Sequence, residues 1–462
     1  MSIIAVFDVG KTNVKLSAAK ADGTIVQTLS APNIVREGPP YRHHDLAALE
    51  DWLTIGLRDL ARHHAIAAIV PCAHGSGGVL VGRNGPVMPM VDYEQEPPAV
   101  VDKAYRSLVG SYLDRGSAIM LGAAHLARQM LWQEMYWPDA FSRAVAVLAA
   151  PQYWAWRLSG VLAGEVTSLA AQSHLWSPAC GRLAPIVETR GWQHLMPPMR
   201  HAWETLGQIK PELAERTGLA PKTRIVCGIH DSSANFYRYQ AAGFSDFTVV
   251  STGTWIVALT DRNGIDPNLE RPGHTFNADV TGRPVPGMLT MGGREFSAVA
   301  AGESGPTSFE ILEKLVRSRT FALPFFGADD GLFPRAARRG RLDGPLAGDP
   351  SARFTLAVLY VALLTAECVE DLPGVANVVL DGTFVKDALF GSIVAALLQN
   401  TRVLVSRSST GTATGAALLA SHTTRHGPAQ LAAEAPTPAL LADLASYRAH
   451  WRARIKELEQ TP

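Results

Sequence analysis

The segment Ile3-Ile-Ala-Val-Phe-Asp8-Val-Gly10-Lys11-Thr12-Asn13-Val-Lys15-Leu16 decides the fold of this chain. Its apolar run ends in Asp-x-Gly, crosses a short polar turn and resumes as a β-like run. Gly10-Lys11-Thr12 looks like the end of a Walker A loop, but that loop needs a glycine at position 5, where this chain has alanine, and a helix afterwards. Here β-like runs follow instead, separated by a turn at 21–23. The segment therefore predicts a strand, a turn sized for a phosphate and a second strand, with Asp8 ending the first strand.

Composition narrows the class of protein. At 462 residues the chain is too long for one ordinary domain, so two large domains or three small ones are expected. The 42 basic and 42 acidic residues cancel, which argues against nucleic acid as the main partner. No basic leader precedes the first apolar run, and the apolar segment 354–366 is too short to cross a bilayer. We therefore expect a buried helix there and a cytoplasmic protein without a membrane partner.

The opening pattern recurs in the second half of the chain. The apolar run Phe247–Ser251 is followed by the small turn Thr252-Gly253-Thr254 and by a second apolar run, Trp255–Leu259. This repeat suggests a duplicated α/β domain with a boundary between Asn235 and Phe247. We accordingly predict one domain over 1–240 and another over 241–462.

Periodicity and turn residues predict the remaining elements. Helices are expected at 45–64, 118–133, 140–158, 354–372, 389–399, 414–420 and 442–458, strands at 65–70, 78–81, 224–228 and 377–380, and a surface loop at 327–349.

Two strand–turn–strand units could face each other across a cleft and cradle phosphate oxygens with backbone N–H groups. Asp8 would repel a phosphate unless a cation lies between them, so its position implies Mg²⁺. Taken singly, either turn could equally be an ordinary β-hairpin.

A third feature is Cys227-Gly-Ile-His230-Asp231-Ser-Ser, which follows a buried strand and opens a helix. Asp231 would suit a general base that takes a proton from a substrate hydroxyl. An aspartate there could equally serve as a helix N-cap. A fourth feature, Asp381-Gly382-Thr383, is a turn through which a flat ring could approach the backbone, or an ordinary strand-to-helix turn.

Together these features resemble the FGGY family of carbohydrate kinases, within the actin/Hsp70/hexokinase-like ATPase superfamily. The resemblance covers nearly the whole chain and rests on the order and spacing of five segments. The two phosphate motifs are matched by Asp8–Lys15 and Ser251–Thr254, and the catalytic base by Gly228–Asp231. Val70–Gly75 matches the segment whose His contacts the sugar, and Asp381-Gly382 with Gly415–Ala417 matches the adenosine motif and its closing helix. Thr12-Asn13, His230-Asp231 and Gly292–Phe296 look most like the rhamnulokinase- and fuculokinase-like branch.

The resemblance implies an α/β fold of two duplicated ribonuclease H-like domains with a cleft between them, and a kinase that transfers the γ-phosphate of ATP to a small ketose, deoxyketose or polyol. Asp231 would be the base and Asp8 would hold Mg²⁺. His74, Asp92 and Tyr93 would contact the sugar. ATP would be bound by Gly10, Lys11, Thr12, Asn13, Thr252, Gly253, Thr254, Gly382 and Thr383. The expected partners are the sugar and ATP, and a homodimer is a possible assembly.

Two departures from the family pattern affect these expectations. Asp381 replaces a glycine where the adenosine would pack, which bears on nucleotide affinity. The stretch Ala170–His174 reads Ala-Ala-Gln-Ser-His where the branch often has Gly, Cys, His, Thr and Asp, which bears on substrate identity and on activity. Lys11 also stands where the first phosphate motif has a threonine.

Other classes fit the sequence less well. The pairs Cys72/His74 and Cys227/His230 could mimic a zinc site, but neither has zinc-finger spacing. His74–Gly78 lacks the third glycine of a dinucleotide fingerprint, and Gly302–Pro306 lacks the last glycine of a serine-hydrolase elbow. The remaining alternative is a non-catalytic nucleotide- or sugar-binding sensor of the same fold, which would have no need of Asp8 and Asp231.

Overall fold

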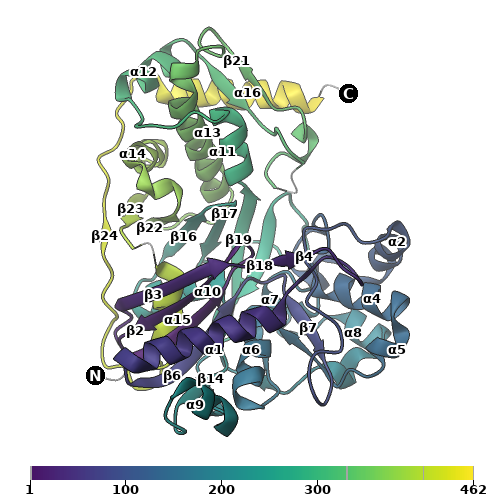
Figure 1. The fold of residues 1–462 in the computed structure, drawn as a ribbon. Coiled ribbons are helices and arrows are strands. Elements are labelled where there is room, and N and C mark those ends of the chain that lie inside the picture. The colour runs from purple at the N-terminus through teal and green to yellow at the C-terminus, as the bar shows by residue number, and fades with distance from the viewer. Residues whose placement is uncertain (1–2, 329–330, 409, 461–462) are drawn as a thin grey trace.

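Two seven-stranded sheets organise the molecule, and in each of them a central strand pairs antiparallel on one side and parallel on the other. The computed structural model describes residues 3–328, 331–408 and 410–460. Figure 1 shows the N-terminal antiparallel strands of the first sheet in purple, the antiparallel strands of the second sheet in teal, and the helices of each half packed around the sheets. The duplicated two-domain α/β fold predicted from the sequence is confirmed.

The first sheet is built around the opening segment. Its strands lie in the order β13-β14-β6-β1-β2-β3, and a short strand, β15, also pairs with β6. The antiparallel trio β1–β2–β3 is joined to β6 and β14 by parallel pairing, which needs a crossover helix. The bounds are β1 Ile3–Val9, β2 Asn13–Ala19, β3 Ile25–Pro32, β6 Ile66–Ala73, β13 Thr205–Gln208, β14 Arg224–Val226 and β15 Ile229–His230.

The second sheet repeats this arrangement. Its order is β18-β19-β17-β16-β22-β23-β24, again with antiparallel pairing on one side of β16 and parallel pairing on the other. The bounds are β16 Phe247–Thr252, β17 Trp255–Thr260, β18 His274–Ala278, β19 Pro284–Met291, β22 Asn377–Gly382, β23 Arg402–Ser406 and β24 Ala433–Glu434. The turns β1–β2 and β16–β17 therefore hold equivalent places, as the repeat in the sequence predicted.

Strand β1 is buried on both faces because alternate residues enter different cores. Phe7 and its odd-numbered neighbours pack with helix α1 (Leu46–His63) and helix α6 (Ala150–Ser159), whereas Ile4 and Val6 pack with helix α15 (Gly411–Leu419). The stripe Leu46, Leu49, Leu53, Leu57 and Leu60 of α1 is buried as its helical spacing predicted.

Helices α10 (Asp231–Ala241) and α15 cross between the two halves. Phe236 and Tyr239 of α10 pack with β16 of the second sheet, while α15, from the second half, packs on the first sheet. The two helices approach so closely that a β-carbon on Gly415 would lie 1.8 Å from the carbonyl oxygen of Ala234. The predicted division at 240/241 thus falls at the end of α10, in the layer that joins the halves.

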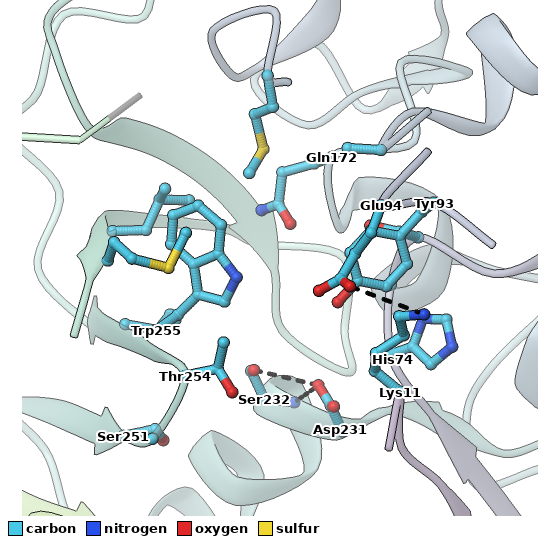
Figure 2. A pocket seen from close by; sticks show the side chains of 18 of the residues that line it. Lys11, His74, Tyr93, Glu94, Gln172, Asp231, Ser232, Ser251, Thr254 and Trp255 are labelled. Carbon is cyan, nitrogen blue, oxygen red and sulfur yellow. Dashed lines mark hydrogen bonds and ion pairs between the residues drawn. The ribbon is translucent and has the colours of Figure 1, made fainter. Parts of the chain in front are cut away.

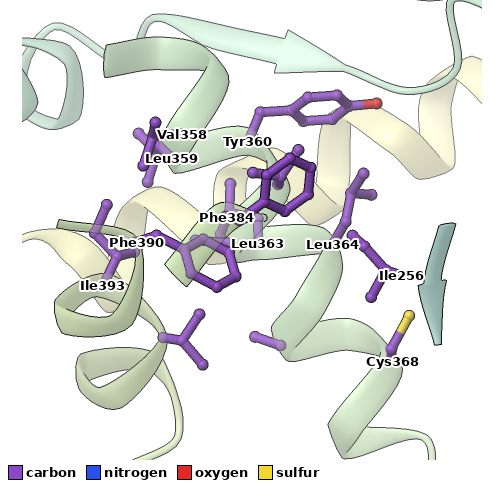
Figure 3. Close-up of a cluster of buried hydrophobic side chains, with 14 of the residues drawn as sticks. Ile256, Val358, Leu359, Tyr360, Leu363, Leu364, Cys368, Phe384, Phe390 and Ile393 are labelled. Atoms are coloured by element: carbon purple, nitrogen blue, oxygen red, sulfur yellow. The ribbon is translucent and has the colours of Figure 1, made fainter. Parts of the chain in front are cut away.

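Helix α13 (Pro350–Glu370) forms the core of the second half (Figure 3). Its length and apolar composition would suit a membrane span, but 83% of the most apolar 18-residue window is buried inside the protein. Its burial was predicted, whereas its 21 residues exceed the predicted apolar segment. The terminal helix α16 (Leu444–Gln460), expected to be polar, buries Trp451 and Ile455 against this core.

Two helix predictions in the first half were wrong in part. Helix α4 (Leu126–Tyr136) begins eight residues later than expected, because the preceding chain turns at Gly122 in a left-handed conformation with φ 62°. Residues Ala146–Ala149 form strand β8, paired with β7 (Gly78–Val81), before α6 begins. Short, fully buried apolar runs do not distinguish strand from helix by periodicity.

The remaining elements complete the chain. In the first half they are β4 Val35–Arg36, β5 His43–His44, α2 Ala99–Leu108, α3 Tyr112–Arg115, α5 Pro138–Phe141, β9 Gly164–Glu165, α7 Val166–Ala170, β10 Trp176–Ser177, β11 Arg182–Leu183, α8 Pro185–Thr189, β12 Met199–Arg200 and α9 Pro211–Thr217, with a 3₁₀ turn at Trp192–Leu195. In the second half they are α11 Gly293–Ala300, α12 Phe309–Arg317, β20 Phe321–Leu323, β21 Arg341–Asp343 and α14 Ala388–Leu397, with 3₁₀ turns at Pro334–Ala336 and Phe384–Lys386.

Candidate active site

A cavity of about 610 Å³ lies between the two halves, at the ends of the central strands (Figure 2). The first half contributes Lys11, His74, Tyr93 and Asp231 to its wall. The second half contributes the complete turn Thr252–Thr254 and Gly382. We call this cavity the acceptor cavity, and it brings together eight of the residues singled out from the sequence.

A second cavity of about 800 Å³ adjoins it and is walled largely by the second half. The two share Glu94, Gly253, Thr254 and Arg294. Its lining is partly aromatic, with Phe296, Phe354, Phe384 and Phe390, and includes Thr12, Thr383, Lys386 and Asp387. We call it the nucleotide cavity. The first phosphate turn therefore sends Lys11 into one cavity and Thr12 into the other.

Asp231 lies at the first position of α10, where β15 ends. The N-cap position belongs to His230, so the capping role left open by the sequence does not fall to Asp231. Its Oδ1 accepts hydrogen bonds from the backbone N–H of Ser232 (2.5 Å) and lies 3.1 Å from Nε2 of His230. Burial alone would raise the pKa of Asp231, but His230, His74 and the Ser232 N–H bring it below the ordinary value. Asp231 is thus an ionised acceptor in the cavity wall.

Asp8 ends β1 beside this carboxylate. Burial and the negative charge of Asp231 raise the pKa of Asp8 to about 7, although the charge of Lys15 opposes them. Asp8 lines neither cavity, but two neighbouring carboxylates that repel each other are suited to share a divalent cation with phosphate oxygens. The residues present therefore fit Mg²⁺.

His74 is 8% exposed, and neither of its ring nitrogens has a hydrogen-bond partner among the described residues. Burial lowers the pKa of His74 to about 4, so the imidazole is neutral and offers one donor and one acceptor. Its ring lies 5.4 Å from the ring of Tyr93, also in the cavity wall. Buried polar atoms normally find partners, so these nitrogens indicate a polar ligand.

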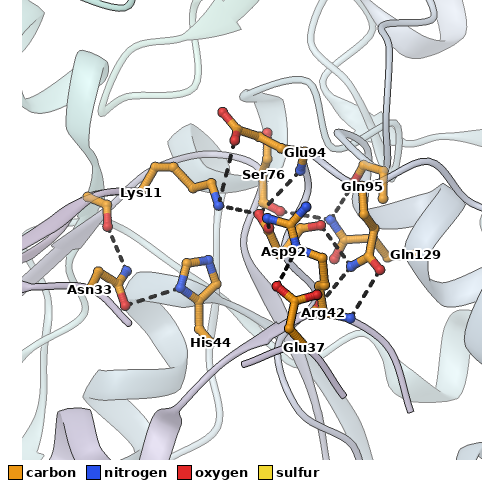
Figure 4. Close-up of polar contacts among 12 residues, drawn as sticks. Lys11, Asn33, Glu37, Arg42, His44, Ser76, Asp92, Glu94, Gln95 and Gln129 are labelled. Atoms are coloured by element: carbon orange, nitrogen blue, oxygen red, sulfur yellow. Dashed lines mark hydrogen bonds and ion pairs between the residues drawn. The ribbon is translucent and has the colours of Figure 1, made fainter. Parts of the chain in front are cut away.

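Asp92 does not line either cavity, in contrast to the sugar contact expected of it. Its side chain is fully buried, and it forms ion pairs with Lys11 and with Arg42 (2.7 Å), as Figure 4 shows. Lys11 lies 4.0 Å from Glu94, which in turn pairs with Arg294 of the second half at 3.3 Å. Asp92 therefore fixes the position of Lys11, and the ion pairs continue across the cleft.

The turns themselves are locked by backbone contacts. The Gly10 N–H donates to the Asn13 carbonyl (3.0 Å), and the Asn33 amide donates to the Gly10 carbonyl (2.7 Å). These contacts shape the first turn, although Gly10 and Asn13 line neither cavity. Gly382 has φ 97°, and a β-carbon there would lie 2.0 Å from the Thr252 carbonyl oxygen. Glycine is thus required where the adenosine-type turn meets the second phosphate turn.

Comparison with known proteins identifies the family of this chain. The model "FGGY family of carbohydrate kinases, N-terminal domain" matches residues 3–236, and "Carbohydrate kinase FGGY, C-terminal domain" matches residues 244–429. The chain belongs to the FGGY family of carbohydrate kinases.

Individual FGGY relatives are more distant. The chain is similar to "L-fuculokinase" of Escherichia coli K12, with 25% identity over 58% of both chains, and to "Probable L-xylulose kinase" of Pasteurella multocida, with 28% identity over 33% of this chain and 32% of that one. The match therefore spans little more than half the length of the fuculokinase. Among solved structures, a carbohydrate kinase from Novosphingobium aromaticivorans has 28% identity and a TM-score of 0.88 over 99% of both chains.

The two departures from the FGGY pattern have structural partners. The Asp381 carboxylate accepts a hydrogen bond from Arg238 of α10 at 2.6 Å, and both side chains are almost fully buried. The negative charge of Asp381 is thus compensated by Arg238, in the layer of helices that joins the two halves. Gln172, in the Ala170–His174 stretch, lines the acceptor cavity.

Sequence reasoning missed several residues of this FGGY site. Glu94, Glu96, Trp255 and Arg294 line the acceptor cavity but were not predicted as site residues, although Arg294 belongs to the segment Gly292–Phe296 that indicated the branch. Glu94 was within reach, because it follows Asp92-Tyr93 directly, and Trp255 because it follows the second turn. Among the described residues no group of three or more His, Cys, Asp or Glu side chains could hold a metal ion, so Cys72, His74, Cys227 and His230 do not converge as a zinc site would require.

Proposed function

We propose that the chain is an ATP-dependent sugar kinase that transfers the γ-phosphate of ATP to a hydroxyl of a small ketose, deoxyketose or polyol. The observation that carries the proposal is the meeting of the two cavities at Gly253-Thr254, with the ionised Asp231 on one side and Thr12 on the other. A sugar in the acceptor cavity and a nucleotide in the nucleotide cavity would then meet at the two turns. FGGY membership supports the same assignment.

The reaction follows from this arrangement. The oxygen of the acceptor hydroxyl attacks the γ-phosphorus, the bond from that phosphorus to the β–γ bridging oxygen breaks, and ADP leaves. Asp231, ionised in the free enzyme, accepts the hydroxyl proton. The turn Thr252–Thr254 lines the acceptor cavity and would contact phosphate oxygens there, while His74 would position the sugar. Closure of the two halves would exclude water and limit hydrolysis of ATP.

Asp8 is the residue proposed to hold Mg²⁺, directly or through water. When bound, Mg²⁺ neutralises the negative charge of the phosphate oxygens and of the neighbouring carboxylates. Burial and the charge of Asp231 raise the pKa of Asp8, and a bound cation would offset the repulsion between the two carboxylates.

Asp231→Asn tests the assignment of the base. The amide keeps the size of the side chain but cannot accept the proton as a carboxylate does, so kcat should fall by about 10²- to 10⁴-fold. Sugar binding, measured by tryptophan fluorescence, should stay nearly unchanged. Asp266→Asn, in an exposed loop, is the matched control and should keep wild-type turnover. Normal turnover of Asp231→Asn would show that another group is the base.

An ATP-consumption screen over ketoses, deoxyketoses and polyols tests the function itself. Turnover with one of them supports the kinase and names its substrate. Nucleotide binding without turnover across the panel would favour the sensor.

We further infer a cytoplasmic location, since ATP and simple sugars are the proposed partners. The predicted homodimer would be tested by size-exclusion chromatography with light scattering.

A further inference from the structure

Gln172 stands out because its backbone is held in a costly conformation. Gln172 and His174 have φ values of 53° and 58°, in the left-handed region that residues with a β-carbon disfavour. Such strain persists only where the surroundings impose it, and it concentrates at functional positions. Gln172 follows α7 and lines the acceptor cavity, so the strain directs a polar side chain into the site.

Two stacked, fully buried imidazoles impose this backbone. His125 and His174 lie with ring centroids 3.6 Å apart. Nδ1 of His125 is 2.7 Å from the Gln172 carbonyl oxygen, and its Nε2 accepts from the Met120 N–H at 2.9 Å. His174 is fixed by the hydroxyls of Tyr105 (2.5 Å) and Ser117 (2.8 Å). His125 thus contacts the backbone of Gln172 directly, and His174, two residues further along the same loop, is held by Tyr105 and Ser117.

The amide of Gln172 is oriented from the other half of the molecule. Its Nε2 donates to Oδ1 of Asn277 at 2.7 Å and to Oγ1 of Thr275 at 3.0 Å, both on β18. An amide nitrogen has two protons, so both are used. The amide oxygen, Oε1, keeps its full capacity as an acceptor.

Gln172 is one of several polar groups in the wall of the acceptor cavity. That wall also contains the apolar side chains Met120, Leu121, Leu289 and Met291 and the carboxylates Glu94 and Glu96. Figure 2 shows the Gln172 amide and the Asp231 carboxylate separated by the open part of the cavity. An acceptor held in a fixed orientation discriminates strongly, because a ligand that buries it without donating a hydrogen bond leaves it unpaired.

We propose that Gln172 is a specificity-determining residue that accepts a hydrogen bond from one hydroxyl of the acceptor sugar, at a carbon away from the phosphorylated one. The inference rests on the proposed function in one respect, that the sugar binds in this cavity. Since the amide is held by β18, the contact also requires the two halves to be in their present arrangement.

A binding cycle tests the proposal independently of turnover. The ketoses D-xylulose, L-xylulose, L-ribulose, L-fuculose and L-rhamnulose are titrated with AMP-PNP present and tryptophan fluorescence as the signal, and single-deoxy analogues of the tightest binder follow. We expect one deoxy analogue to bind the wild type about 10- to 100-fold more weakly. Gln172→Met should bind the parent sugar equally weakly and show no further loss with that analogue. Additive losses at every position would overturn the proposal.

Two more variants separate recognition from structure. Gln172→Glu keeps an acceptor oxygen but loses both donors to β18, so it should still discriminate against the same analogue, which makes the test independent of whether Gln172→Met folds. Equal affinity of Gln172→Glu for that analogue and the parent sugar would overturn the proposal. Gln208→Met, at an exposed glutamine of β13, is the matched control and should bind every ligand as the wild type does. If these results hold but ATP is not consumed, the proposed kinase activity fails while the recognition role of Gln172 stands.

Discussion

At the scale of single residues, Lys11 shows how one substitution in a motif is accommodated. The sequence showed only that Lys11 stands where the first phosphate motif has a threonine. In the structure it pairs with Asp92, which is 81 residues away in the sequence and has no exposed side-chain surface. Burying a carboxylate is costly unless it is paired, so Lys11 and Arg42 together keep Asp92 ionised inside the protein. The side chain of Lys11 is thereby held in the acceptor cavity.

A double-mutant cycle over Lys11→Met, Asp92→Asn and the double variant should show strong coupling. We expect Lys11→Met alone to lower the free energy of unfolding by about 1–3 kcal/mol, because Asp92 then keeps only a half-exposed arginine. The double variant should recover part of that loss, and urea denaturation measures all three. The exposed pair Arg407–Glu434 is the control and should couple by less than about 1 kcal/mol. Equal, additive losses at Lys11 and Asp92 would contradict the pairing.

At the scale of elements, the sequence predicted those helices and strands whose hydrophobic periodicity can be seen in neighbouring residues. The stripe of α1 and the antiparallel trio β1–β3 follow from periods of 3.6 and 2, and the N-cap Asp45 fits its helix. Strand β8 was mistaken for helix because its partner β7 lies about 65 residues earlier, and pairing at that distance leaves no local signal. For the same reason the sequence showed that Ala170–His174 departs from the family pattern, but it could not show that His125 stacks on His174.

That anchor makes a pH-dependent prediction. Burial lowers the pKa of His125 to about 3 and that of His174 well below its ordinary value. Below about pH 6.5 both imidazoles therefore bind protons in the unfolded chain but not in the folded protein. The free energy of unfolding consequently falls as the pH falls. From pH 6.5 to 5 each buried imidazole should account for about 2 kcal/mol. His125→Asn should show a correspondingly shallower fall in urea denaturation, and His426→Asn, at an exposed position, should give the wild-type curve. Parallel curves for His125→Asn and wild type would contradict this origin of acid sensitivity.

At the scale of the whole molecule, the two halves are joined by an exchange of helices. α10 continues from the strand that presents Asp231 and packs on the second sheet, while α15 packs on the first sheet. The repeat in the sequence indicated two equivalent units and a cleft between them. It could not indicate this exchange, because helix packing across units depends on contacts between residues about 180 positions apart, such as Ala234 and Gly415. Residues at the base of the cleft, Arg238 and Asp381 among them, belong to the same joining layer.

Gly415→Ala should therefore disturb stability and catalysis together. The added methyl would lie 1.8 Å from the Ala234 carbonyl oxygen, so α10 and α15 must separate. Overpacking of this kind should cost about 3 kcal/mol of unfolding free energy. Because α10 carries Asp231, kcat should also fall, by more than the loss of folded protein explains. Gly348→Ala is the matched control, since nothing lies within 4 Å of a β-carbon there, and it should leave both quantities at wild-type values. A Gly415→Ala protein as stable and active as that control would show that the close packing of α10 on α15 does not set the geometry of the cleft.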